Sequence, residues 1–127
     1  MKSSILALAA SLALTSAALA GGGGHSHKGP HGGTLVDVPG GHAEFVDTPT
    51  EIRLHLSDED GKPLSSKGAS GKATVLASGK TETIVLSPAQ PDKLVGSLPR
   101  PLAAGDKVVV SAKTPDGRAI QVRHVEK

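Results

Sequence analysis

The chain contains no cysteine, tryptophan or tyrosine, and Phe45 is its only phenylalanine. Without cysteine, an exported domain can form no disulfide, no thiolate nucleophile and no sulfur metal site. The single methionine is Met1. Metal ligands in this chain must therefore be imidazole, carboxylate or backbone groups. Such ligands suit Zn(II), Cu(II), Ni(II) or Co(II) better than Cu(I).

The near absence of aromatic residues also argues against nucleic-acid binding, because single strands are held largely by stacking on aromatic rings. The 14 basic and 12 acidic residues are almost balanced, and the basic ones are scattered along the chain. Catalytic patterns are missing as well: there is no Gly-x-Ser-x-Gly elbow, no His-Glu-x-x-His and no phosphate-binding loop. We therefore expect neither a nucleic-acid partner nor an enzyme.

The first twenty residues have the pattern of a secretory signal peptide. Lys2 supplies a positive charge, an apolar run of Ala, Leu and Ser follows, and Ala18-Leu19-Ala20 is a small-x-small cleavage site. A membrane anchor is the alternative, but the apolar run is short for a bilayer span. We expect cleavage after Ala20, which leaves a periplasmic protein without a membrane span.

Residues 21–33 are dominated by glycine and contain half of the six histidines: His25, His27 and His31. A segment without apolar side chains cannot compensate the entropy of ordering it, so we expect a flexible tail. Short histidine-rich tracts bind metal ions. The alternative is a low-complexity linker whose histidines are incidental.

From Thr34 onwards, short runs rich in Val, Leu, Ile and Thr alternate with turn residues, which is typical of strands. They predict about eight strands over residues 34–127 and no helix. The expected fold is all-β, an antiparallel β-sandwich of the immunoglobulin-like type, with an open barrel as the alternative. The proline-containing stretch 87–92 is expected to be a connection. The expected strands cover residues 34–38, 42–46, 51–56, 72–77, 81–86, 93–98, 107–112 and 118–125.

The second and third of these strands predict a pair of histidines. If Phe45 lies opposite Ile52, both apolar sets face the core and His42 lies opposite His55 on the outer face. Directly opposed Cβ atoms lie about 4.5–5.5 Å apart, so both imidazoles could bind one ion. Glu44, on the same face, could be a ligand or could orient a ligand imidazole. The alternative is a pair of solvated surface residues.

The predicted metal site thus joins strand residues to the tail. It consists of His42 and His55 with Glu44 nearby, completed by His31, His25 or His27, and its imidazole-rich set favours Zn(II) or Cu(II). His31 is the preferred tail residue because it is nearest the first strand, which costs least chain entropy. His124 shares the inward parity of the last strand, and a structural role is expected for it.

Three short motifs resemble a known group of proteins: Gly29-Pro30-His31-Gly32-Gly33, Gly41-His42-Ala43-Glu44-Phe45 and Asp58-Glu59-Asp60-Gly61-Lys62-Pro63. The pattern is similar to that of small exported proteins of Gram-negative bacteria. It also resembles the N-terminal region of periplasmic adaptor subunits of heavy-metal efflux pumps of the resistance-nodulation-division type.

The resemblance implies a periplasmic β domain that handles divalent transition metals, with His31, His42 and Glu44 as functional residues. Ala43 stands where many members of that group carry a second histidine. The coiled-coil hairpin and lipoyl-like segments of a full adaptor are missing, which implies an isolated domain: a metal buffer, carrier or chaperone with an efflux-pump component as partner. The alternative function is a β-sandwich module of the cell envelope that binds another protein and needs no metal.

Overall fold

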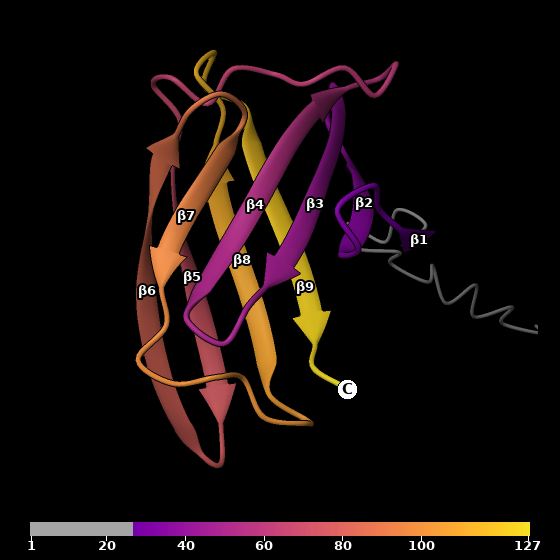
Figure 1. The fold of residues 1–127 in the computed structure, drawn as a ribbon. Helices are drawn as coiled ribbons and strands as arrows, with labels where there is room; N and C mark the ends of the chain where they lie inside the picture. Colours follow the sequence, from indigo (N-terminus) through magenta and orange to yellow (C-terminus); the bar gives the residue numbers. More distant parts are fainter. Residues whose placement is uncertain (1–26) are drawn as a thin grey trace, which may run out of the picture.

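The computed structural model describes residues 27–127, which form nine antiparallel strands and no helix (Figure 1). All eight strands predicted from the sequence are present, with ends shifted by a few residues, so the all-β prediction is confirmed. The predicted signal peptide and His25 lie outside the described residues. The strands are β1 (His27–Lys28), β2 (Thr34–Val38), β3 (Gly41–Asp47), β4 (Glu51–Asp58), β5 (Ser70–Ala77), β6 (Lys80–Ala89), β7 (Lys93–Ser97), β8 (Lys107–Lys113) and β9 (Ala119–Val125).

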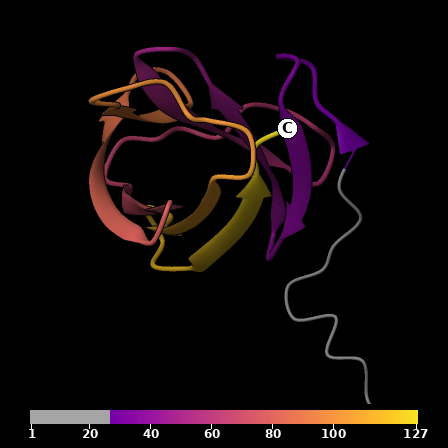
Figure 2. The same cartoon turned by 90° about the horizontal axis from the view of Figure 1, so that it is seen from below.

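The strands belong to one continuous sheet in the order β1-β2-β3-β4-β7-β6-β5-β8-β9. The sheet curls into two layers, and its β9 edge returns to lie beside β2 and β3 (Figure 2). One layer contains β3-β4-β7-β6 and the other β5-β8-β9, which is the strand order of an immunoglobulin constant-type domain. Strands β1 and β2 are added at one edge. The fold is therefore the predicted immunoglobulin-like sandwich.

Strand alternation builds an aliphatic core between the layers. In β4, Ile52, Leu54 and Leu56 are buried while the residues between them are partly exposed. Phe45 of β3 is only 1% exposed and is the one aromatic core residue that the sequence offers. Within the described residues, no helix has the length and apolarity that crossing a bilayer requires.

Strand β6 continues through Pro88, where the sequence predicted a connection. Its first part pairs with β5, whereas Ser87 to Ala89 pair only with β7. A proline lacks the backbone N–H and is tolerated where a strand has a neighbour on one side only. The same change of partner carries the sheet from one layer into the other.

The predicted register of β3 against β4 is wrong by two residues. Phe45 lies opposite Leu54 and not opposite Ile52. A shift of two keeps every side chain on its expected face, so the apolar pattern could not tell the two registers apart. The turn decides between them: the Thr48 hydroxyl accepts hydrogen bonds from the backbone N–H groups of Thr50 and Glu51, which tightens the hairpin. The other pairs are Ala43 opposite Leu56, Glu44 opposite His55, and His42 opposite Ser57.

Residues 27–33, expected to belong to a flexible tail, form a hairpin with β2. His27 pairs with Leu35 and Lys28 with Thr34. Between the strands, the Gly29 N–H donates to the Gly33 carbonyl at 2.9 Å. Backbone pairing supplies the stabilisation that this segment's side chains cannot, and it brings His31 over the outer face of β3.

Candidate metal centre

Glu44 is the centre of the site, and its side chain is 2% exposed although it lies on the outer face of β3. The hairpin of residues 27–33 covers it. A Cβ atom on Gly29 would collide with the Glu44 carboxyl group, and one on Gly33 would collide with the Phe45 carbonyl oxygen. The two glycines are therefore what allows the hairpin backbone to lie directly on β3.

The Glu44 carboxylate accepts hydrogen bonds from three donors of that hairpin. The backbone N–H of His31 donates to both oxygens at 2.9 and 3.2 Å, and the N–H of Gly33 donates to Oε2 at 2.9 Å. The third contact, from His31 Nδ1 to Oε1, is 2.6 Å long. A carboxylate with its acceptor sites occupied in this way is better suited to orienting a ligand than to being one.

These contacts shift the pKa of Glu44. Burial alone would raise it, but the hydrogen bonds from the His31 ring and from the Gly33 and His31 backbone, with the His31 charge, outweigh burial. The net effect lowers the pKa of Glu44 below its usual value. The group is therefore an anion at neutral pH.

The Glu44 contact fixes the tautomer of His31. A carboxylate can only accept, so Nδ1 of His31 carries a proton, and in the neutral form of the ring Nε2 keeps its lone pair. The His31 side chain is 47% exposed, so the ring can be reached from solvent. A carboxylate that holds one imidazole nitrogen while the other binds an ion is the usual arrangement around protein-bound zinc.

His55 of β4 lies directly against His31. The two rings stack with centroids 3.8 Å apart and planes inclined by 7°. Nδ1 of His55 is buried and has no hydrogen-bond partner within the described residues. Burial, followed by the nearby charge of His31, lowers the pKa of His55, so its imidazole is neutral at pH 7 and retains a lone pair for a metal ion.

His42 lies two residues before Glu44 in β3, on the same face, and its ring faces two acceptors. Nδ1 is 3.1 Å from the Asp58 carbonyl oxygen, and Nε2 is 3.1 Å from Oδ1 of Asp37. A neutral imidazole can donate to only one of them. If the proton is on Nδ1, then Nε2 and the Asp37 carboxylate both present lone pairs, and their separation would suit chelation of one divalent ion. Asp37 is a candidate ligand that the sequence analysis missed.

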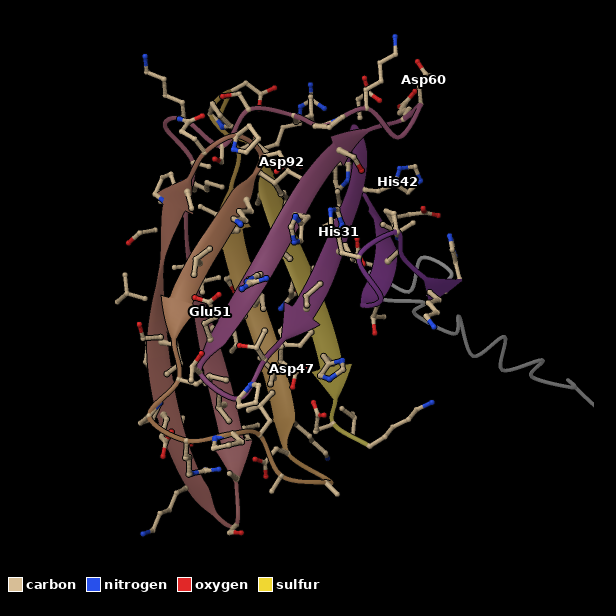
Figure 3. All side chains as sticks on the ribbon, in the orientation of Figure 1. His31, His42, Asp47, Glu51, Asp60 and Asp92 are labelled. Carbon is tan, nitrogen blue, oxygen red and sulfur yellow. The ribbon has the colours of Figure 1, made fainter. Side chains whose placement is uncertain are left out.

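The three histidines line one surface cavity of about 270 Å³ together with Glu44. Its wall includes acidic residues of two loops, Glu59, Asp60 and Asp92. Figure 3 shows Asp60 and Asp92 at the same end of the sandwich as His31 and His42. The negative wall favours cations over anions at this opening.

The arrangement is not a closed coordination sphere as it stands. Imidazole lone pairs lie in the ring plane, so stacked parallel rings direct them side by side and not toward one point. Zinc requires nitrogens about 2.0–2.1 Å away in a tetrahedral arrangement, so one ring must rotate to bind the same ion as the other. Among the described residues, the side chains whose ligand atoms already lie within 4.8 Å of one another are a different set: Asp47, His124 and Glu126.

The structure therefore brings together four of the residues predicted from the sequence: His31, His42, Glu44 and His55. The direct opposition of His42 and His55 is wrong, because Glu44 takes that place beside His55. His27 is exposed in β1 and does not line the cavity, and His25 lies outside the described residues. Comparison of the chain with protein-family models, with curated proteins and with solved structures found no match.

Proposed function

We propose that the protein binds divalent transition-metal ions in the periplasm and acts as a buffer, carrier or metal chaperone in heavy-metal homeostasis or efflux. The observation that carries the proposal is the Glu44–His31 contact beside a buried His55 nitrogen that has no hydrogen-bond partner among residues 27–127. An ion-pairing carboxylate on one imidazole nitrogen raises the basicity of the other and directs it outward. Nothing in this arrangement requires a chemical reaction.

The ligand set favours Zn(II) or Cu(II), with Ni(II) and Co(II) as further candidates, because it combines imidazoles with carboxylates and lacks sulfur. His31 and His55 are the proposed core ligands. His42 is the third ligand, and Glu44 orients His31. His25 and His27 would then serve as auxiliary ligands that capture an ion and deliver it inward. The motif resemblance to efflux adaptors supports a pump component as the receiving partner.

A titration with Co(II) tests this proposal, because its absorption spectrum reports the number and type of ligands. The mature chain from Gly21 should bind one ion in the cavity with a tetrahedral spectrum, and Zn(II) should displace it. The double variant His31→Ala/His55→Ala should lose this spectrum, whereas Lys28→Ala, an exposed position of the same hairpin with no proposed ligand role, should retain it. An unchanged spectrum and affinity in the double variant would refute the site.

The alternative, a protein-binding module, is favoured by one surface feature. A cavity of about 830 Å³ is lined by residues of β2, β5, β6, β8 and β9, among them Val38, Val85 and Ile120, and Val85 is 71% exposed. If metal ions at saturating concentration change neither the melting temperature nor the NMR spectrum of residues 27–55, the protein-binding function is favoured over metal binding.

A further inference from the structure

A second group of potential ligands lies at the other end of β3, away from the histidine cavity. Asp47 ends β3, His124 is near the end of β9, and Glu126 follows β9. One ligand atom of each side chain lies within 4.8 Å of the others, and His124 Nε2 is 3.0 Å from Glu126 Oε2. Figure 3 shows Asp47 toward the opposite end of the sandwich from Asp60.

The imidazole in this group is held in place by the core. The His124 ring stacks on Phe45 with centroids 4.3 Å apart, and its side chain is 16% exposed. The backbone of Glu126 is fixed as well, since its N–H donates to the Asp106 carbonyl and its carbonyl accepts from Gly105. Ligands whose positions are set by packing and backbone bonds lose little entropy when an ion binds.

Two carboxylates at this distance repel one another. Burial, followed by the adjacent Glu126 carboxylate, raises the pKa of Asp47 above its usual value. A cavity of about 430 Å³ gives access from solvent. Two basic residues, Arg123 and Lys127, also line this cavity. Among the described residues, however, Glu126 forms its ion pair with His124 and not with either of them. A divalent cation in the centre of the group would replace the repulsion with attraction to both carboxylates, and it would take the place of the proton through which His124 Nε2 contacts Glu126.

We propose that Asp47, His124 and Glu126 form a second divalent-cation site, distinct from the histidine cavity, that takes Mn(II) or Zn(II). Two carboxylates and one imidazole are a harder ligand set than the three histidines, and carboxylate oxygens suit Mn(II). The bound ion would join β9 to β3. These strands are in contact without being paired in the sheet, because β9 pairs with β8 and β3 with β2 and β4.

Paramagnetic broadening by Mn(II) tests the proposal in the full mature chain, followed by NMR. Substoichiometric Mn(II) should broaden the amide signals of Asp47 and of residues 122–127 first. The double variant Asp47→Asn/Glu126→Gln should lose this broadening, and the matched variant His31→Ala/His55→Ala should keep it. The second variant separates this site from the proposed histidine site, since each can fail without the other.

A thermal readout guards against a folding defect. Because the amide substitutions remove a repulsion, Asp47→Asn/Glu126→Gln should melt at or above the wild-type temperature without metal. It should lose the Mn(II)-dependent rise in melting temperature that the wild type shows. Two results would overturn the inference: broadening that is strongest around Glu59 and Asp60, or equal broadening in the double variant and the wild type. Either would mean that the three side chains form only a local ion pair.

Discussion

At the scale of single residues, Glu44 differs most from its sequence-based expectation. Alternation along β3 places it on the outer face, and an outward carboxylate is normally solvated. In the structure it is one of three buried polar or charged residues among those described. The cause is the hairpin that folds over it and supplies three hydrogen-bond donors. Those donors make burial of the anion tolerable, since a buried charge is retained only when it is paired.

The first prediction concerns the substitution Glu44→Gln. Glutamine has nearly the same shape, but its NH₂ group is a donor and cannot accept from the backbone N–H groups of His31 or Gly33. Leaving such a donor unsatisfied costs about 1–3 kcal/mol of the free energy of unfolding. Loss of the partner that orients His31 should also weaken Co(II) binding by about 10–100-fold. Urea denaturation and a Co(II) titration measure the two effects.

The control for this substitution is Glu59→Gln, which removes an exposed carboxylate from the wall of the same cavity. It should leave the free energy of unfolding within about 0.5 kcal/mol of wild type. Wild-type Co(II) affinity in Glu44→Gln would show that Glu44 does not orient a ligand.

The second prediction concerns the acid side of the stability curve of the metal-free protein. The lowered pKa of His55 means that, below about pH 6.5, the unfolded chain binds a proton that the folded chain resists. Stability should therefore fall as the pH drops from 6.5 toward the folded pKa. The lowered pKa of Glu44 has the same sign, but its loss begins only below the ordinary glutamate value.

Urea titrations in EDTA between pH 7.5 and 5 measure this loss, with His55→Gln as the comparison because glutamine does not titrate. The raised pKa of Asp47 acts in the opposite direction, since it costs stability as the pH rises. Asp47 has this effect in both wild type and His55→Gln, so its contribution cancels in the difference between their stabilities. Parallel curves for wild type and His55→Gln would contradict the assignment to His55.

At the scale of strands and turns, periodicity predicted which face each residue occupies but could not fix its partner. Phe45 and Ile52 are both buried as expected. Their register depended on whether the Thr48 hydroxyl tightens the turn, which is a contact that no apolar pattern encodes. The hairpin of residues 27–33 was missed for a related reason. Its stabilisation comes from backbone pairing and from contacts with Glu44, and its glycines indicated flexibility when they in fact permit close approach.

The third prediction tests that close approach through the substitution Gly29→Ala. The added methyl group would collide with the Glu44 carboxyl group, so the hairpin must lift or the carboxylate must turn away. Either movement breaks the contact with His31 and should lower metal affinity. The free energy of unfolding should be affected less than the metal affinity, because β1 is a two-residue strand at the edge of the sheet.

A Co(II) titration measures the loss of metal affinity, and the amide NMR spectrum shows whether the structural change stays local. Signals of residues 27–33 and of Glu44 should shift, while those of β5 and β8 should not. Lys28→Ala is the matched control, because it removes an exposed side chain of the same hairpin without adding an atom near Glu44. Wild-type metal affinity in Gly29→Ala would show that the hairpin need not lie on β3 for binding.

At the scale of the whole molecule, the sandwich was predictable because it follows from alternation, turn chemistry and the absence of helix patterns. The site was predictable only as a set of residues. His31, His42, Glu44 and His55 do line one cavity, yet their mutual geometry depends on the register and on the hairpin. The contact between Phe45 and His124 could not be predicted, because it joins strands that are neighbours only when the sheet curls.

The last prediction concerns the dependence of the whole fold on its one aromatic residue. Phe45 is 1% exposed and contacts a core otherwise made of Leu, Val, Ile and Ala. Phe45→Ala should cost about 3–5 kcal/mol, the usual range for a buried phenylalanine. Since small domains have only about 5–15 kcal/mol of stability in total, the variant should be partly unfolded near 37 °C.

The control is Leu76→Ala, at a side chain that is 43% exposed, which should cost less than about 1 kcal/mol. Urea midpoints by circular dichroism compare the two. Equal midpoints would mean that the aliphatic residues alone specify the sandwich and that Phe45 serves chiefly to position His124.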